Sequence, residues 1–476
     1  MTSGIMITPS SLAEPIRERM RIVADAYQSE QDDLSSVVSD LLAQLDQPQS
    51  AQDALTALHR LQRFATVAAL DIHHHPKIRE ALTDTDKFPL WEQYAAFDTH
   101  DTNIEKLAQA LYNGDAQRRS PILLSLTNDS RFVPEKIVEY CVRDDMELDI
   151  RVVDPVFDRR ILHCVDTETA AKFGVMVAMH REYAQRLIGF NHNNTGFNMI
   201  DPAPETIIAD AYDQAWSSRR RAYGSDTFFT VTRVPTPYMA EIDRIPYNEY
   251  IDGFCRMADV DNRELKAVNE IFVDILNNAK NISLYNNDGT DFHISVDGFD
   301  AVNSATERNI PGGEAFTAPE KYSASGKIVA KGAFVSPQNG YVMRDLTLVF
   351  EQGKIVDAKA EEGEEHLLNI LNKDEGVRYL GEFAIGTNWA FKTHISNTLL
   401  VEKIGGSFHV ALGNAYKNRT ENGRHIRLDN GNESQIHWDI AIMLFGKNGR
   451  IIVDGKPIME DGLYLDPRLS KLNMPV

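Results

Sequence analysis

The sequence predicts an α/β protein with three parts: a helical N-terminal extension, an α/β domain, and a strand-rich mixed C-terminal domain that carries a metal site. Three observations support this class. No glycine occurs between Ile5 and Asn113, an apolar strand–helix–strand pattern follows, and short strands dominate from about Asp291 onwards. A chain of 476 residues is consistent with two or three domains. We expect the domains to span residues 1–115, 116–290 and 291–476.

The N-terminal extension has the periodicity of amphipathic helices. In "SSLAEPIRERMRIVADAY" and "DDLSSVVSDLLAQL", apolar residues recur every three or four positions. Ser10, Ser11 or Asp33 can cap these helices, and few breaking residues lie between them. The three histidines at positions 73–75 are consecutive, so they cannot share one face of a helix, and we do not expect a metal site there.

The second part begins with a β-α-β pattern. "PILLSLTN" and "ELDIRVVD" are short apolar runs, and "PEKIVEYCVRDDM" between them has helical spacing. This order predicts two parallel strands joined by a crossover helix. Further helices are expected over Thr167–Leu187 and Thr206–Ala222, followed by a strand in "DTFFTVTRVPTP" that ends at prolines.

The third part consists mainly of short strands, separated by glycines and Asn/Asp pairs. The strands are expected in "DFHISV", "TLVF", "KIVDAKA", "YLGEFAIG", "FHVALG", "IHWDIAIML" and "RIIVDG", with one helix in "GEEHLLNILNKD". In a strand, residues i and i+2 point to the same face, so His437 and Asp439 are expected to project together. A buried carboxylate needs compensation. From these residues alone, a metal ion and a structural hydrogen-bonded pair both remain open.

Composition excludes several classes of function. The formal net charge of −21 and the pI near 5.1 argue against nucleic acid and anionic membranes as general partners. The three cysteines form no CxxC pair, which favours a reducing compartment over a disulfide framework. Neither a secretory signal nor a membrane-spanning run is recognisable, so a cytoplasmic protein is expected. No Gly-rich phosphate loop and no G-x-S-x-G elbow occur.

Acids and histidines recur inside the apolar strands of the third part, and neighbouring segments supply few lysines or arginines. A pair of divalent cations would neutralise such acids. Carboxylates with imidazoles and no thiolate suit Zn, Mn, Co or Fe. Because carboxylates outnumber imidazoles, two metals that share acids are favoured, and such sites activate water for hydrolysis. The residues concerned are Glu314, Glu382, Glu402, His409, His437 and Asp439.

Four motifs together resemble a known family. "NIPGGEAFTAP", "LGEFAIGTN", "EKIGGSFHVALGNAY" and "HWD" stand in the order and spacing of the thermophilic metalloaminopeptidases, the aminopeptidase T, aminopeptidase S and PepS group. The similarity covers roughly Phe228 to Gly462. It implies a homodimeric aminopeptidase that hydrolyses N-terminal residues from peptides through a metal-activated water. Its cofactor would be two divalent metal ions: Zn, Co or Mn.

The resemblance also implies roles for individual residues. Glu382 would either bridge the metals or act as general base and acid, and Tyr416 would donate a hydrogen bond to the tetrahedral oxyanion. Glu402 lies seven residues before His409, a spacing that differs from the best-known members, so its role as a ligand is a separate hypothesis. The metal ligands implied by the motifs are Glu314, Glu382, His409, His437 and Asp439.

Two alternatives remain open at this stage. His409, His437 and Asp439 alone form a set of two histidines and one carboxylate, typical of non-haem Fe(II). The 2,5-dihydroxypyridine dioxygenases look like relatives of the aminopeptidases with such an iron, and retention of Glu314 and Glu382 favours two metals instead. The second alternative is a catalytically silent scaffold that uses the N-terminal helices for docking. Those helices lie outside the family pattern.

Overall fold

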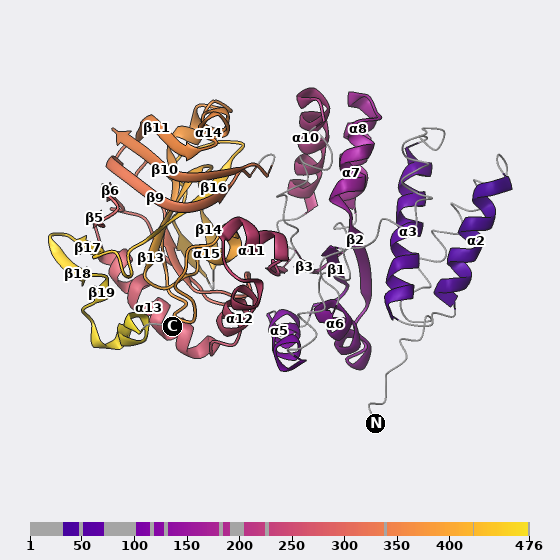
Figure 1. Ribbon diagram of the computed structural model, residues 1–476, viewed down its shortest axis with the longest axis horizontal. Helices are drawn as coiled ribbons and strands as arrows, with labels where there is room; N and C mark the ends of the chain where they lie inside the picture. The colour runs from indigo at the N-terminus through magenta and orange to yellow at the C-terminus, as the bar shows by residue number, and fades with distance from the viewer. Residues whose placement is uncertain are drawn as a thin grey trace. The chain divides into compact units, whose positions relative to one another are not determined.

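The chain folds into two compact units in a computed structural model, unit 1 extending to Val234 and unit 2 beginning at Pro235 (Figure 1). The model describes residues 32–46, 51–70, 101–114, 119–127, 132–179, 184–190, 204–223, 228–337, 340–421 and 423–474. The histidine run at 73–75 and the first expected helix lie outside these ranges. The expected boundary at residue 290 falls inside unit 2, between two strands that pair with each other. The three-part division therefore stays a prediction.

Unit 1 contains a four-stranded parallel sheet in the order β2-β1-β3-β4. The strands are β1 (Ile122–Thr127), β2 (Leu148–Val153), β3 (Arg186–Phe190) and β4 (Phe228–Thr232). The helices are α5 (Asp101–Asn113), α6 (Phe132–Arg143), α7 (Pro155–Leu162), α8 (Thr167–Met179) and α10 (Thr206–Tyr223). The expected β-α-β unit is confirmed as β1-α6-β2. The helix expected over Thr167–Leu187 was too long: it ends at Met179, and Leu187 lies in β3, which is buried along its whole length.

The N-terminal extension is helical where the structure describes it, in α2 (Asp32–Asp46) and α3 (Ala51–Ala69). Gln62 of α3 bonds to β2, an edge strand of the sheet. Its Nε2 donates to the Ile150 carbonyl at 2.7 Å, and its Oε1 accepts from the Val152 amide at 3.1 Å. Unpaired edge groups invite pairing with another chain. One side-chain amide thus satisfies two backbone groups at this edge.

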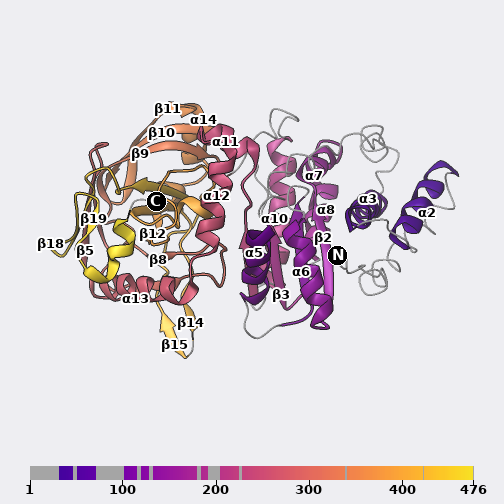
Figure 2. The ribbon, with the colours of Figure 1, turned by 60° about the horizontal axis from the view of Figure 1, so that its bottom comes forward.

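Unit 2 is built from two antiparallel sheets. The larger has the order β11-β10-β9-β6-β5-β17-β18-β19, and the smaller has the order β16-β13-β12-β8-β7. Figure 2 shows β9, β10 and β11 of the larger sheet side by side. The strands of the larger sheet are β5 (Asn281–Tyr285), β6 (Asp291–Ser295), β9 (Ser325–Val335), β10 (Val342–Glu351), β11 (Lys354–Glu362), β17 (Arg450–Val453), β18 (Lys456–Glu460) and β19 (Leu463–Tyr464). The strands of the smaller sheet are β7 (Val302–Ser304), β8 (Glu314–Thr317), β12 (Leu380–Gly386), β13 (Ser407–Gly413) and β16 (His437–Met443).

The helices of unit 2 are α11 (Pro237–Asp243), α12 (Tyr247–Ala258), α13 (Asn262–Asn278), α14 (Glu364–Leu371) and the short α15 (Thr398–Val401). A small hairpin, β14 (Arg419–Glu421) and β15 (Arg424–Ile426), follows the smaller sheet's β13 in sequence. The strands and the helix expected in this part of the chain are confirmed. None of the helices among the described residues combines the length and the apolar character needed to cross a bilayer.

Both sheets of unit 2 contribute to one apolar core. It contains Phe292 and Leu348 from the larger sheet together with Phe383, Phe408 and Trp438 from the smaller one. In the smaller sheet these apolar side chains alternate along each strand with residues whose side chains point to the opposite face of the sheet. The strands β12 and β13 are nevertheless buried along their whole length, so their second face is also covered. That second face carries the acids and the imidazoles.

Candidate metal centre

The strand register brings the candidate ligands onto one face of the smaller sheet. Glu382 in β12 lies opposite Ala411 in β13, and Ala411 lies opposite Asp439 in β16. Two residues further along each strand, His409 pairs with Ala384, and Gly413 pairs with His437. Directly paired residues point to the same side of a sheet, and so do residues i and i+2. The polar side chains therefore share a face on which their neighbours are alanine and glycine.

Glycine is required where two of these strands begin or end. Gly313, just before Glu314, has a φ of +129°, and a Cβ there would lie 2.9 Å from the Cβ of Asn388. Gly413, opposite His437, has a φ of +96°, and a Cβ would collide with the Ile436 carbonyl oxygen. L-residues with side chains rarely adopt either conformation. The "PGGE" and "ALGN" segments therefore position Glu314 and His437 through backbone that only glycine permits.

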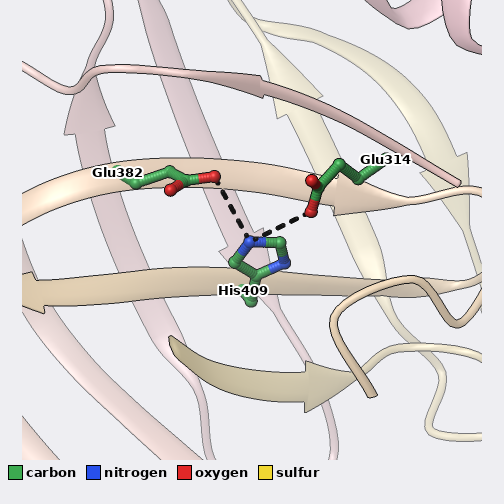
Figure 3. Close-up of side chains that lie close together, drawn as sticks. All are labelled: Glu314, Glu382 and His409. Carbon is green, nitrogen blue, oxygen red and sulfur yellow. Dashed lines mark ion pairs between the residues drawn. The ribbon is translucent and has the colours of Figure 1, made fainter. Parts of the chain in front are cut away.

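Three overlapping groups of side chains have the proximity of metal ligands. They are Glu314–Glu382–His409, Glu382–His437–Asp439 and Glu402–His409–Asp439, and within each group one ligand atom per residue lies within 4.8 Å of the others. Glu314, Glu382, Glu402 and His409 are all less than 9 % exposed. Figure 3 shows Glu314 and Glu382 directing their carboxylates at His409 from two sides. The structure thus brings together all six residues that the sequence predicted as ligands.

The separations within these groups fit metal coordination better than direct pairing. His409 Nε2 lies 3.5 Å from Glu382 Oε1 and 3.7 Å from Glu314 Oε2. Among the described residues, both ring nitrogens of His409 are buried without a hydrogen-bond partner. Metal–ligand bonds of about 2.1 Å place two ligands of a tetrahedral ion roughly 3.4 Å apart. The donor types and their spacing therefore suit a divalent cation.

Glu382 directs its two oxygens at two different imidazoles. Oε1 lies 3.5 Å from His409 Nε2, whereas Oε2 lies 3.3 Å from His437 Nε2. His437 Nε2 also lies 3.6 Å from Asp439 Oδ1. Glu382 thus links the two histidines of the cluster, one through each oxygen.

Two of the four acids have a basic partner that the sequence analysis did not single out. Lys403 is fully buried, and its Nζ lies 2.6 Å from Glu314 Oε1 and 2.6 Å from Glu402 Oε1. Glu382 and Asp439 have no lysine or arginine partner among the ion pairs of the described residues. The sequence offered a signal that was missed, because Lys403 follows Glu402 directly in an otherwise apolar segment.

Glu402 and Tyr416 occupy different parts of the site. Glu402 ends α15 and is buried beside His409 and Asp439, despite its unusual spacing in the sequence. Tyr416 is 40 % exposed, and its ring centroid lies 5.2 Å from that of Phe316 and 5.3 Å from that of His437. Tyr416 thus stands where the cluster meets solvent.

The electrostatics of the site link Glu382 to the two histidines. Burial disfavours ionised Glu382, but the adjacent imidazoles outweigh it and lower its pKa to about 2. For His409, burial is outweighed by Glu382, Glu314 and Asp439, which raise its pKa to about 9. For His437, burial is outweighed by Asp439 and Glu382, and the pKa rises to about 10. Without ions, protons therefore serve as the cations between these acids and imidazoles.

The remaining acids are more weakly compensated. Burial raises the pKa of Glu314 and of Glu402, although Lys403 opposes both shifts. The pKa of Lys403 itself is raised, because these two glutamates outweigh its burial. The negative charge of Glu382, followed by burial, raises the pKa of the Tyr416 phenol well above its ordinary value. With both imidazoles neutral, as metal ligands are, four carboxylates and one ammonium leave an excess of negative charge for divalent cations to offset.

Neighbouring polar groups hold the ligands in place. His437 Nδ1 bonds to the Asn414 carbonyl at 2.7 Å, which leaves Nε2 directed at Glu382. Asn269 is buried and donates to the Glu314 carbonyl at 2.9 Å. Such outer contacts orient metal ligands in known sites. The sequence analysis did not single out Asn269 or Asn414, because their roles depend on contacts between distant segments.

Comparison with known proteins identifies relatives of this chain. It is 34 % identical over 215 residues to aminopeptidase AmpS of Bacillus subtilis (strain 168), covering 40 % of this chain and 51 % of that protein. It is 35 % identical over 161 residues to aminopeptidase T of Thermus aquaticus, covering 32 % of this chain and 37 % of that protein. The chain thus matches about half or less of the length of these curated relatives.

One solved structure shares the fold, and a second aligns with a lower score. Wild-type AmpT from Thermus thermophilus aligns with a TM-score of 0.62 and 20 % identity, over 77 % of this chain and 100 % of that one. The structure of a 2,5-dihydroxypyridine dioxygenase from Pseudomonas putida KT2440 aligns with a TM-score of 0.47 and 16 % identity, over 78 % of this chain.

A family model described as "Thermophilic metalloprotease (M29)" matches residues 100–464. The match confirms the resemblance inferred from the motifs. It also begins well before Phe228, so it includes the α/β region that the similarity of the motifs did not reach. Since the match covers most of the chain, this protein belongs to the thermophilic metalloprotease (M29) family.

Proposed function

We propose that this protein is an aminopeptidase with a dinuclear metal centre, which removes N-terminal residues from peptides. The observation that carries the proposal is the position of Glu382, whose two oxygens face two different histidines. Family membership and the aminopeptidase names of its relatives support the reaction class.

The described side chains divide between two subsites. Glu314, His409 and one oxygen of Glu382 would hold one ion, and His437, Asp439 and the other oxygen of Glu382 would hold the second. Glu402 adjoins His409 and Asp439 and would complete the set. Carboxylate and imidazole donors suit Zn, Co or Mn.

When bound, two such ions would activate a water molecule and polarise the scissile carbonyl. The protein's own groups supply orientation and charge. Glu382 shared between subsites fixes their separation, which supports its bridging role over that of a mobile proton carrier. Tyr416 projects at the solvent edge, and its hydroxyl would donate a hydrogen bond to the oxyanion of the tetrahedral intermediate. A tyrosine hydroxyl carries its own proton at neutral pH, as this role requires.

The iron-dioxygenase alternative has weaker geometric support. A site with two histidines and one carboxylate requires His409, His437 and Asp439 around one ion. Among the described residues, none of the three ligand groups contains both histidines. Each histidine instead belongs to a group with at least two carboxylates. A catalytically silent scaffold is expected to lack at least one type of metal-ligating residue. All six candidate positions, however, carry a carboxylate or an imidazole.

The proposal is tested by metal content together with substrate requirement. Protein loaded with Zn, Co or Mn is expected to hold two ions per chain and to hydrolyse leucine p-nitroanilide. The matched substrate N-acetyl-leucine p-nitroanilide, whose amine is blocked, is expected to remain intact. A single iron per chain would favour the dioxygenase, and a fully loaded protein without peptidase activity would favour the scaffold.

A peptide substrate, a homodimer and a cytoplasmic location belong to the same proposal. No nucleic-acid or membrane partner is proposed, in keeping with the net charge of −21. Sedimentation analysis of the purified chain measures its assembly directly, and a monomer at all concentrations would remove the dimer from the proposal.

A further inference from the structure

The smaller sheet's acidic face contains a cation supplied by the chain itself. Lys403 is fully buried, and its Nζ donates to Glu314 Oε1 and Glu402 Oε1, each at 2.6 Å. The side-chain oxygen of Asn309, with the amide oriented to satisfy both of its ends, accepts a third bond at 3.2 Å. An ammonium has three donors and no acceptor. All three N–H donors are used, so this ammonium has none left to donate to a substrate.

The backbone of Lys403 is held as firmly as its side chain. Its amide donates to the Leu400 carbonyl at 3.0 Å, and its carbonyl accepts from the Asn388 amide at 2.8 Å. Asn388 in turn packs against Gly313, next to Glu314. The ammonium is therefore fixed relative to both of its carboxylate partners.

We propose that Lys403 is a positioning residue of the metal centre: it occupies one oxygen of Glu314 and one of Glu402, so that each glutamate offers only its second oxygen to an ion. This inference rests on the two-ion site proposed above. The second oxygen of Glu314, Oε2, is the one that faces His409 at 3.7 Å. One oxygen of Glu402 lies within 4.8 Å of ligand atoms of His409 and Asp439. An ammonium held on one oxygen thus disfavours chelation of an ion by both oxygens of the same glutamate.

The same contacts predict a role before ions bind. Glu314 and Glu402 are both buried, and an uncompensated buried carboxylate is costly. Lys403 offsets part of this cost when the ions are absent. Bound ions would offset the same cost of burying the carboxylates. Removal of Lys403 is therefore expected to destabilise the ion-free protein more than the ion-loaded protein.

The test compares Lys403→Met with the matched variant Lys392→Met. Lys392 is partly buried, but its Nζ donates to backbone carbonyls, those of Gly405 at 2.9 Å and Leu472 at 2.7 Å, and within the described part of the chain it pairs with no carboxylate. Each full-length variant is loaded with Co²⁺, and three quantities are measured: ions bound per chain, the visible Co²⁺ absorption spectrum, and the melting temperature with and without Co²⁺.

For Lys403→Met we expect two Co²⁺ per chain and weaker absorption per ion, because chelation by both carboxylate oxygens raises the coordination number. We also expect Co²⁺ to raise its melting temperature by at least about 4 °C more than it raises that of the wild type. Lys392→Met is expected to keep the wild-type spectrum and the wild-type gain from Co²⁺.

A Lys403→Met variant with the wild-type spectrum and the wild-type gain would overturn the inference. If that variant does not fold even with Co²⁺, Lys403→Gln decides, since glutamine can donate to one glutamate while releasing the other. An unchanged spectrum in Lys403→Gln overturns the inference, and a weakened one supports it. Failure of the proposed function is recognised separately, from wild-type protein that binds fewer than two ions or cleaves no peptide.

Discussion

Glu382 Oε2 lies 3.3 Å from His437 Nε2, and the other oxygen of the same carboxylate faces a second imidazole. This relationship joins three adjacent strands of one sheet through a single carboxylate. It arises from the register of β12, β13 and β16, in which residues two apart on each strand lie side by side.

Glu382→Gln is expected to lower the metal content below two ions per chain and to reduce peptide hydrolysis by about 10²- to 10⁴-fold. An amide offers one oxygen and no charge, so it cannot serve both histidines. Metal analysis and initial rates with leucine p-nitroanilide measure the effect. The exposed acid Glu361, which pairs with Lys331 far from the cluster in sequence, supplies the control Glu361→Gln. Near-normal activity with full metal content would refute the bridging role.

Tyr416→Phe is expected to keep both ions and to lower kcat by about 10²- to 10³-fold, with a smaller change in KM. The phenyl ring retains the contacts with Phe316 and His437, while the hydroxyl donor is lost. Steady-state kinetics on the metal-loaded variant separate the two constants. A loss of bound metal, with kcat per loaded site unchanged, would contradict a role for this hydroxyl in the oxyanion's stabilisation.

Removal of the metals with a chelator is expected to abolish hydrolysis and to lower the melting temperature. Ions that bind only the folded state at a hundred times their Kd add about 2.7 kcal/mol to the free energy of unfolding. Re-addition of Zn, Co or Mn should restore both properties, as followed by calorimetry and by activity. A melting temperature that the chelator does not change would show that groups other than metal ions compensate the buried carboxylates.

The stability of unit 2 is expected to fall as the pH drops from 6.5 towards 4, in part because of His394. Its Nε2 is buried without a hydrogen-bond partner among the described residues, and burial lowers its pKa to about 4. The unfolded chain, with a histidine pKa near 6.5, binds a proton in this range that the folded chain does not. The contribution of neutral His394 to the free energy of unfolding is therefore fully present above pH 6.5. It falls by roughly 3 kcal/mol as the pH drops from 6.5 to 4.

Urea unfolding of metal-loaded wild type and His394→Asn, at about pH 7.5 and about pH 5, measures this contribution. The loss of unfolding free energy between the two values should be smaller in the variant. Because other groups titrate equally in both proteins, the difference between the two losses isolates His394. Equal losses would contradict the prediction.

Gln62→Leu is expected to destabilise unit 1 by about 1–3 kcal/mol. The substitution leaves the Ile150 carbonyl and the Val152 amide without their side-chain partner at the edge of the sheet. Hydrogen exchange at the Val152 amide and chemical unfolding both report the loss. Protection of that amide equal to the wild type would show that another group satisfies the edge.

Much of the architecture could be predicted from local patterns. Alternation with a period of two places Glu382 and Ala384 on one face and Phe383 on the other, and the same rule unites His437 with Asp439. Helix α10 was predicted to within one residue, because its periodicity and boundaries are local. The expected helix over Thr167–Leu187 extended too far, because the chain enters the buried strand β3 after α8 and only the sheet decides that change.

The sequence by itself determined which donors this protein offers, because residue types and strand periodicity are properties of short segments. It also determined that these donors are carboxylates and imidazoles in or next to apolar segments. Only the tertiary structure decided how they meet: that Glu382 faces two histidines, and that Lys403 reaches Glu314 as well as its neighbour Glu402. These contacts depend on the register between strands and on the course of the loop around α15. Both are set by packing between segments that lie far apart along the chain.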